Sequence, residues 1–444
     1  MNIFWFRRDL RLEDNAGLYH ALRGDEPVLP LFIFDKNILD KLEERCDARV
    51  HFIHTIILEL QSQLKAFGST ILVKYGNPTE IWKELVKEHK IENVYTNHDY
   101  EPYGKKRDEE VQSILATKNI GFHTFKDQII FESHEVTKND GGTYTVFSPY
   151  AKKWRAKLQT HLVETDDGTI SYFFQSYPTE KYFSNFLKKE TISTITLEEM
   201  GFEPSNISIP PKTVARKIVK QYDKNRDFPA IEGTTRLGIH FRFGTISIRE
   251  KARLASKLNE TYLSELIWRD FYAQILNEYP HVVENAFRAK YDRIPWRSSE
   301  DDFEKWKAGK TGYPLVDAGM RELNTTGHMH NRVRMVVASF LTKHLLLDWR
   351  WGEAYFAQKL LDFDLASNNG GWQWASGSGT DAAPYFRIFN PTSQLKKFDK
   401  ELKYVKKWVP EFGTFKYPQP MVDHKAARER CLETYKAALN QDKM

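Results

Sequence analysis

The chain has 444 residues, a formal net charge of +5 and an aromatic content of 14%, with 11 tryptophans. This length allows two or three domains with well-buried cores. The two cysteines, Cys46 and Cys431, lie far apart in the sequence. They argue against a disulfide framework and against a cysteine-based metal site, and they favour a reducing compartment. The small basic excess permits nucleic-acid binding without requiring it.

No feature of the sequence predicts a secreted protein or a membrane protein. The N-terminus lacks the basic and then apolar layout of a signal peptide. The sequence also contains no run of about 18 apolar residues that could span a bilayer. We therefore expect a cytoplasmic protein that has no membrane partner and binds no metal.

The first 130 residues alternate short apolar runs with helical patterns. Five runs are typical of buried parallel strands: 2–6, 28–34, 70–73, 93–96 and 122–125. Three segments between them have helical apolar spacing: 48–67, 78–90 and 103–118. This alternation predicts a doubly wound, Rossmann-like α/β domain with a parallel sheet over residues 1–130. No Gly-x-Gly-x-x-Gly follows the first strand, so that dinucleotide-binding motif is absent.

The α/β alternation ends after residue 130. Residues 131–213 carry the Gly and Pro of loops, with helical spacing near 149–161, and are predicted to be a linker between domains. Residues 214–444 are predicted to form an all-α domain. Its expected helices are 247–258, 262–278, 313–324, 331–347 and 352–362.

The most informative stretch is Asp362-Phe-Asp-Leu-Ala-Ser-Asn-Asn-Gly-Gly-Trp-Gln-Trp374. Acids and amides supply hydrogen bonds, paired glycines allow a close approach to the backbone, and tryptophans offer π surface. The mixture suits a planar heterocycle with polar edges. An Asx-rich turn that leads into a core tryptophan explains the same residues about equally well.

This stretch resembles the flavin-contacting signature of the photolyase/cryptochrome family. The segments Phe6-Arg-Arg-Asp-Leu-Arg-Leu-Glu-Asp-Asn15 and Asn324-Thr-Thr-Gly-His-Met-His-Asn-Arg-Val-Arg-Met335 resemble that family too. The form Asn368-Asn-Gly-Gly-Trp-Gln-Trp374 is most similar to class I photolyases of cyclobutane pyrimidine dimers. The resemblance implies an α/β domain followed by a C-terminal all-α FAD-binding domain. It also implies light-dependent repair of these dimers, with UV-damaged DNA as the partner and a monomer as the working form.

The resemblance assigns FAD to the helical domain. A loop with adjacent hydroxyls that enters a helix can hold a diphosphate, although such loops are also common helix caps. In this family, the loop that matches Thr234-Thr-Arg-Leu-Gly238 binds the FAD diphosphate, and its fifth residue is usually Ser rather than Gly. Arg334 is expected to pair with Asp362 beneath the flavin ring, and Asn368 to face flavin N5. The full expected set is Tyr222, Thr234, Thr235, Arg236, Leu237, Gly238, Arg269, Arg334, Asp362, Asp364 and Asn368.

The same resemblance places a substrate pocket beside the flavin. Trp268 and Trp374 are expected to be its walls, and Glu265 is expected to hydrogen-bond the pyrimidine edge. Glu265 and Trp268 share one face of a predicted helix, a pattern that a buried Trp beside a surface Glu explains as well. Asn331 and Met335 complete the catalytic set. Family members that repair (6-4) lesions carry histidines at both positions, so that substrate is not expected.

Two further sets follow from the resemblance. Trp296, Trp349 and Trp372 match the tryptophans that relay electrons to the flavin from the surface. Arg226, Arg332, Lys396 and Lys397 are candidates for contacts with the phosphates that flank the lesion, although the lysines are equally well explained as solvated surface.

A second, antenna chromophore is also implied. Folate-type members carry an Asn-Glu pair where this chain has Tyr103 and Gly104, which argues against folate. Asn97-His-Asp-Tyr-Glu-Pro-Tyr-Gly104 is more similar to members with deazaflavin- or flavin-type antennas. The residues implicated are Asp35, Arg49, Asp99 and Glu101. Helix capping and loop solvation are the competing explanation for these polar residues.

Three other functions are considered. A cryptochrome-type blue-light receptor without repair activity would usually carry Asp or Cys at position 368 and an altered residue at 374. A flavoprotein that acts without light would need no paired tryptophan walls. A single-strand-specific protein of the DASH cryptochrome type usually lacks Trp at position 374, where this chain has Trp374.

Overall fold

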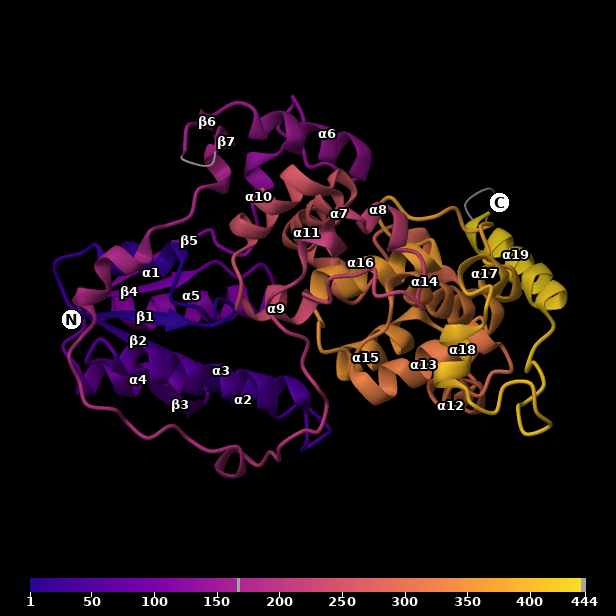
Figure 1. The fold of residues 1–444 in the computed structure, drawn as a ribbon, viewed down its shortest axis with the longest axis horizontal. Coiled ribbons are helices and arrows are strands. Elements are labelled where there is room, and N and C mark those ends of the chain that lie inside the picture. The colour runs from indigo at the N-terminus through magenta and orange to yellow at the C-terminus, as the bar shows by residue number, and fades with distance from the viewer. Residues whose placement is uncertain (166–167, 441–444) are drawn as a thin grey trace. The chain divides into compact units, whose positions relative to one another are not determined.

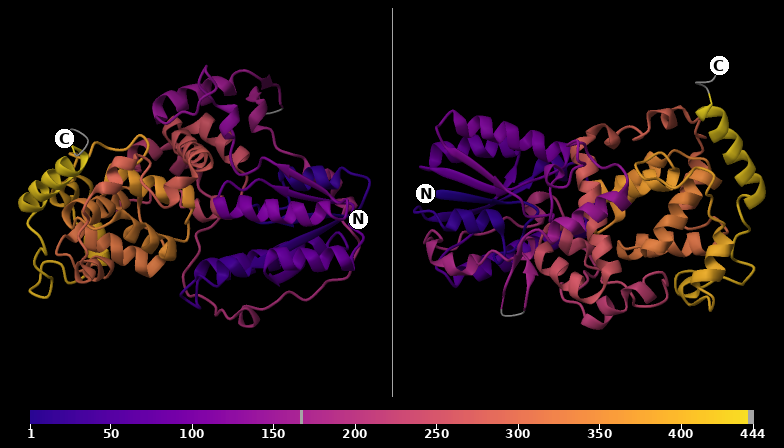
Figure 2. Two further views of the ribbon diagram at one scale, coloured as in Figure 1. Left: turned by 180° about the vertical axis from the view of Figure 1, so that it is seen from behind. Right: turned by 90° about the horizontal axis from the view of Figure 1, so that it is seen from above.

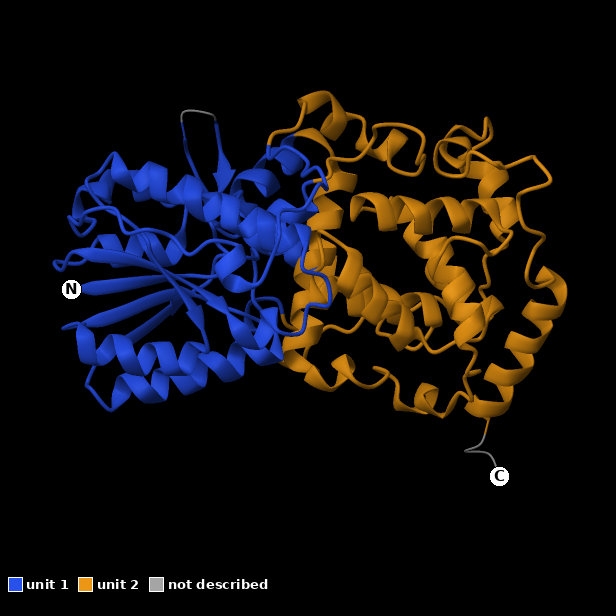
Figure 3. Ribbon diagram, turned by 90° about the horizontal axis from the view of Figure 1, so that it is seen from below, with its two compact units in different colours: residues 1–136, 152–212, 237–257 blue, residues 137–151, 213–236, 258–444 orange. Residues whose placement is uncertain are grey.

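The computed structural model describes residues 1–165 and 168–440. The chain forms two compact units, which Figure 3 shows in two colours. Unit 1 comprises residues 1–136, 152–212 and 237–257, and unit 2 comprises 137–151, 213–236 and 258–444. Residues of the predicted linker therefore belong to both units, and so do residues of the predicted helical domain.

Unit 1 is built on a five-stranded parallel sheet with the order β3-β2-β1-β4-β5 (Figure 1). The strands are β1 (Asn2–Phe6), β2 (Val28–Asp35), β3 (Leu72–Gly76), β4 (Asn93–Asn97) and β5 (Gly121–Phe125). Strand order reverses between β1 and β4, which makes this the switch point of a doubly wound sheet. The predicted fold class of this half is confirmed.

Helices cover the sheet of unit 1 on both faces (Figure 2). They are α1 (Ala16–Leu22), α3 (Ala48–Lys65), α4 (Pro78–Glu88) and α5 (Pro102–Ala116), with the short α2 (Lys36–Leu39). Ile3 and Trp5 of β1 share a core with Trp82 of α4 and Val111 of α5. Right-handed crossovers therefore place α1 and α3 on the opposite face.

The remaining elements of unit 1 are short. β6 (Leu162–Val163) and β7 (Ile170–Ser171) form a two-stranded antiparallel sheet. α9 (Gly238–Phe243) and most of α10 (Ile248–Leu258) complete the unit. α6 (Phe147–Leu158) lies where helical spacing occurs in the predicted linker, and its first residues belong to unit 2.

The named elements of unit 2 in the described residues are all helices, joined by loops, which confirms the predicted fold class of the second half. Its longer helices are α11 (Glu260–Glu278), α13 (Pro314–Thr326), α14 (Asn331–Ser339), α15 (Trp349–Lys359), α16 (Leu365–Ser376) and α19 (His424–Leu439). Shorter ones are α7 (Arg216–Lys220), α8 (Tyr222–Asn225), α12 (Glu300–Lys307), α17 (Pro391–Phe398) and α18 (Lys403–Trp408). No helix in the described part of the chain combines the length and apolarity needed to cross a bilayer.

The helix expected over 331–347 differs from its prediction. α14 ends at Ser339 and continues as a π-helical turn, η7 (Phe340–His344). Such turns insert one extra residue into the helical repeat and so redirect the side chains that follow. All five residues of η7 are buried.

The π-helical turn places a buried lysine against the end of α16. Lys343 is 1% exposed. Its Nζ donates to the carbonyl of Ser376, the last residue of α16, at 2.7 Å and to that of Tyr385 at 3.4 Å. Nζ also lies 3.9 Å from the centre of the Tyr435 ring. Because the last carbonyl groups of a helix lack partners within the helix, the N–H donors of Lys343 hold the end of α16 in place.

Burial lowers the pKa of Lys343 to about 7. In the unfolded chain a lysine keeps its proton up to about pH 10.4. Between these values the unfolded state binds more protons, so the free energy of unfolding should rise as the pH is raised from about 7 to about 10. We expect the Lys343→Met variant to lose this rise, as measured by urea unfolding at both pH values. If the free energy of unfolding changed equally with pH in the two proteins, Lys343 would not be the group responsible for the rise.

Candidate functional site

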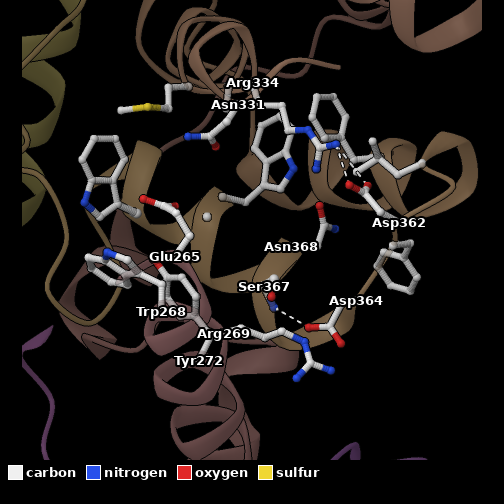
Figure 4. A pocket seen from close by; sticks show the side chains of 18 of the residues that line it. Glu265, Trp268, Arg269, Tyr272, Asn331, Arg334, Asp362, Asp364, Ser367 and Asn368 are labelled. Atoms are coloured by element: carbon white, nitrogen blue, oxygen red, sulfur yellow. Dashed lines mark hydrogen bonds and ion pairs between the residues drawn. The ribbon is translucent and has the colours of Figure 1, made fainter. Parts of the chain in front are cut away.

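Unit 2 contains a cavity of about 410 Å³, which lies within the size range of pockets for small molecules and cofactors. Its lining residues come from α11, α14, α15 and α16, from the segment between α15 and α16, and from Arg226 at the end of α8. Figure 4 shows most of their side chains. Charged, amide and aromatic side chains all face it. Of the residues expected to hold FAD, it is lined by Arg269, Arg334, Asp362, Asp364 and Asn368.

The glycine-rich stretch that lines this cavity is a helix rather than a turn. Asp364 caps the N-terminus of α16 by accepting a hydrogen bond from Ser367 N at 3.0 Å. Gly370 is required there, because a Cβ atom would lie 2.2 Å from Cδ1 of Tyr272. Gly371 lines the cavity, and a Cβ at this position would meet no atom within 4 Å. The two glycines thus let α16 approach α11 on one side and leave open space on another.

An arginine–aspartate pair lines the cavity. Arg334 Nη2 donates to both carboxylate oxygens of Asp362, at 3.0 and 2.9 Å, and its Nε donates to Met329 O at 2.7 Å (Figure 4). Both side chains are about three-quarters buried. A guanidinium held by two acceptors is fixed in orientation, so its remaining N–H groups can present a fixed donor pattern to a bound ligand.

Asn368 has a partner that the sequence gave no reason to single out. Its Nδ2 donates to Glu353 Oε1 at 2.8 Å and to the Glu353 carbonyl at 3.1 Å. These bonds fix the amide so that its oxygen remains the free end. Burial raises the pKa of Glu353, which lies on α15. Glu353 and Asn368 are 15 residues apart in the sequence and lie on different helices. Their contact therefore depends on how α15 packs against α16.

The expected substrate residues Glu265, Trp268, Asn331, Met335 and Trp374 all line the same cavity. Glu265 and Trp268 lie on α11, Asn331 and Met335 on α14, and Trp374 on α16. The structure therefore gathers all five residues from three helices around one space.

Glu265 is already engaged within the protein. Arg226 Nη1 donates to Glu265 Oε1, and Arg226 also lines the cavity. Burial raises the pKa of Glu265, against the opposing effect of Arg226. Arg226, which we expected to contact DNA phosphates, therefore also orients this carboxylate.

The other residues expected to contact phosphates lie away from the cavity lining. Arg332 Nη2 pairs with Asp227 Oδ1 at 2.7 Å, and its guanidinium lies 4.4 Å from the centre of the Phe398 ring. Lys396 and Lys397 are exposed on α17.

Two of the three expected relay tryptophans are fully buried, and the third is partly buried. Trp372 lines the cavity and is 2% exposed, whereas Trp349 is 1% exposed and lines no part of it. Trp296 is partly buried, with its ring 5.9 Å from that of Tyr435. Gly352 is needed beside Trp372, because a Cβ there would lie 2.1 Å from the indole.

The expected diphosphate segment is not part of the cavity lining. Tyr222 packs edge-on against Tyr262, and Thr235 Oγ1 lies 3.3 Å from the Tyr262 hydroxyl. Thr234 is half-buried, and Arg236 is exposed with a φ of +52°. Leu237 and Gly238 begin α9 in unit 1.

Three of the expected antenna residues meet in unit 1 at the switch point of the sheet. Arg8, after β1, pairs with Asp99 at 3.5 Å and with Glu101 at 2.8 Å, both after β4. Arg107 lies 3.6 Å from Asp99 and 3.8 Å from Asp35. Burial disfavours ionised Asp99, but the surrounding guanidiniums lower its pKa to about 2.

The fourth antenna residue pairs with an aspartate at the start of α3. Arg49 pairs with Asp47, which caps the N-terminus of α3, at 2.5 Å. The structure thus links Asp35, Asp99 and Glu101 through Arg8 and Arg107. Arg8 follows β1, whereas Arg107 lies on α5.

The cavity of unit 2 suits a flavin. It combines broad aromatic faces with a fixed guanidinium, a free amide oxygen and acidic side chains in its lining. It also has unfilled space beside Gly371, into which no protein atom extends. Such a cavity matches a flat, polar-edged ring system, and Arg269, Arg334, Asp362, Asp364 and Asn368 are the groups that would hold it.

Comparison with known proteins gives the family. Residues 2–167 match the family model "DNA photolyase", and residues 262–416 match "FAD binding domain of DNA photolyase". The deoxyribodipyrimidine photo-lyase of a Synechococcus species is 36% identical over 99% of this chain and 96% of its own. The solved structure of a class III photolyase from Agrobacterium tumefaciens is 33% identical, with a TM-score of 0.84 over 98% of this chain and 97% of its own.

A second solved structure bears on the cofactors. The Sulfolobus tokodaii photolyase, described with two FAD molecules, is 34% identical and has a TM-score of 0.82 over 98% of this chain and 100% of its own. Each of these three relatives is 33–36% identical to this chain and covers 98–99% of it. The chain therefore belongs to the photolyase/cryptochrome family.

Proposed function

We propose that this chain binds FAD and repairs cyclobutane pyrimidine dimers in DNA by a light-dependent reaction. The observation that carries the proposal is a cavity that brings the expected flavin residues together with two tryptophans and the partly buried carboxyl group of Glu265. The names of its relatives, deoxyribodipyrimidine photo-lyases at 35–36% identity, support it. When bound, FAD supplies the absorption of light and an electron that is lent to the dimer and then returned.

The protein's own contribution is binding, orientation and electrostatics. Trp268 and Trp374 offer flat faces on which the two fused pyrimidines can pack. A damaged, poorly stacked dinucleotide costs less to extrude from a duplex than an intact one, which favours the lesion over normal bases. We propose that Lys396, Lys397 and Arg332 contact the flanking phosphates, which would position the DNA without reading its sequence.

Glu265 is proposed to stabilise charge on the pyrimidine carbonyls. Its raised pKa allows its carboxyl to hold a proton more readily than an exposed glutamate can. A donor at this place becomes more valuable as the carbonyl oxygens gain negative charge. Arg226, bonded to Oε1, keeps the carboxyl oriented and adds a positive charge beside it.

Two supporting roles complete the proposal. Trp372, Trp349 and Trp296 would carry electrons inward to keep the flavin reduced, a task separate from repair. The ion-paired residues Asp35, Asp99 and Glu101 of unit 1 would form the neighbourhood of an antenna chromophore of the flavin or deazaflavin type. We also propose that the protein works as a monomer, as its resemblance to the family implies.

The proposed function is tested by illumination. A purified protein with flavin absorption should remove dimers from a thymine-dimer oligonucleotide in blue light and leave them intact in the dark. Dimer loss can be followed by the return of thymine absorbance. A flavin-bearing protein that removes no dimers under light would instead favour a receptor without repair activity.

We expect Glu265→Ala to lower the repair rate by about tenfold or more, the cost of losing one hydrogen bond to a charged group. The bound flavin should be retained, as measured by its absorbance. Glu278→Ala is the matched control, because Glu278 is an exposed residue at the end of the same helix. Repair by Glu265→Ala at the wild-type rate would show that the role is misassigned.

We expect Asp362→Ala to weaken flavin binding by roughly 10- to 100-fold, because Arg334 loses its charged partner. Release of flavin fluorescence on dilution measures this. Asp348→Ala is a suitable control, since Asp348 makes a similarly exposed pair with Arg350 outside the cavity lining. Equal flavin affinity in both variants would contradict the role given to Asp362.

A further inference from the structure

Trp268 is covered on one side by a residue that the proposed function does not use. Phe147, the first residue of α6, stacks on its indole with ring centres 3.7 Å apart and planes 4° apart. The two rings also meet Phe271 edge-on, at 5.8 and 5.6 Å. Because Phe147 covers one face of the indole, only the other face and the edges remain for the cavity.

The contacts of Trp268 continue to α16 through a second ring, which is tilted against the indole rather than stacked on it. Tyr272 lies 5.4 Å from Trp268 with a tilt of 30° between the rings. The Tyr272 ring in turn rests on Gly370 of α16, where no side chain fits between them. Phe147, Trp268, Tyr272 and Gly370 thus form one packed column from α6 to α16. In such a column, Trp268 cannot move back from the cavity without displacing its neighbours.

The end of this column is fastened by a distant loop. Phe147 N donates to Asp381 Oδ2 at 3.1 Å, and Thr380 Oγ1 donates to Thr145 O at 2.5 Å. Asp381 adopts a φ of +44°, a left-handed conformation that costs energy for a residue other than glycine. This strain persists because the two bonds hold the loop against the start of α6. From the other side, Gln274 of α11 donates to Tyr144 O at 3.2 Å.

We propose that Phe147 is a positioning residue of the substrate pocket, which fixes Trp268 as a rigid wall, and that Asp381 holds Phe147 in register. This inference rests on the proposed function. Phe147 itself lines no part of the cavity, so it acts only through Trp268. A wall that is ordered before the dimer arrives loses no rotamer freedom on binding, which preserves affinity for the dimer.

The test compares affinities in the dark. We expect Phe147→Ala to bind a thymine-dimer oligonucleotide about 5- to 10-fold more weakly, which corresponds to the loss of one aromatic pair. Affinity for the undamaged oligonucleotide and the flavin content should not change. Phe147→Tyr keeps the ring and should restore dimer affinity to within about twofold. The repair yield per absorbed photon at saturating dimer should fall less than the affinity does.

Asp381 provides a second pair of variants, which decides the question if Phe147→Ala does not fold. Asp381→Asn keeps an oxygen acceptor for Phe147 N and should bind the dimer nearly as well as the wild type. Asp381→Ala should show the same selective loss as Phe147→Ala.

Two failures can be told apart. If the wild type repairs dimers but folded Phe147→Ala or Asp381→Ala binds them as tightly as the wild type, the positioning role is wrong. An equal loss of affinity for damaged and undamaged DNA would also overturn it. If the wild type removes no dimers under light, the proposed function fails first.

Discussion

The close packing of α16 against α11 is the constraint on which the candidate site depends. At Gly370 the helix backbone meets the ring of Tyr272 directly, and a single added carbon atom would clash. This contact sets how far Trp374 of α16 lies from Trp268 of α11, and so sets the width of the cavity. α16 is also held at both ends, by the Asp364 cap and by the hydrogen bond from Lys343 Nζ to Ser376 O. A helix fixed at three points can hold its polar residues at defined positions around a ligand.

Charge is arranged around this frame in pairs rather than as single groups. Arg334 is paired with Asp362, and Arg226 is paired with Glu265. Pairing lowers the cost of keeping charged groups in a half-buried cavity, and it orients them before any ligand binds. Ligand binding then requires little rearrangement of these side chains. The same logic applies in unit 1, where Arg8 and Arg107 hold Asp99 ionised in a buried position.

Patterns in the sequence predicted some elements of the fold and some residues of the site, but not others. Apolar runs and their spacing predicted the five strands and the helices α3, α4 and α5, but not the short α1 and α2. Burial of a parallel strand leaves a strong signal in the sequence. The motif around Asn368 pointed to the flavin residues that share the cavity. Its helical conformation was not predicted, because Asx residues and two glycines normally favour turns, and only the Tyr272 ring explains Gly370. The π-helical turn, the Glu353–Asn368 bond and the Phe147–Trp268 stack arise from tertiary packing, for which no sequence signal exists.

The central claim is that one cavity receives both the flavin and the dimer. It is tested most directly by titrating the flavin-loaded protein with a thymine-dimer oligonucleotide in the dark while recording flavin absorption. The account predicts a change in the flavin spectrum that saturates as the dimer binds, and none with the undamaged oligonucleotide. Tight, selective binding of the dimer that leaves the flavin spectrum unchanged would contradict it.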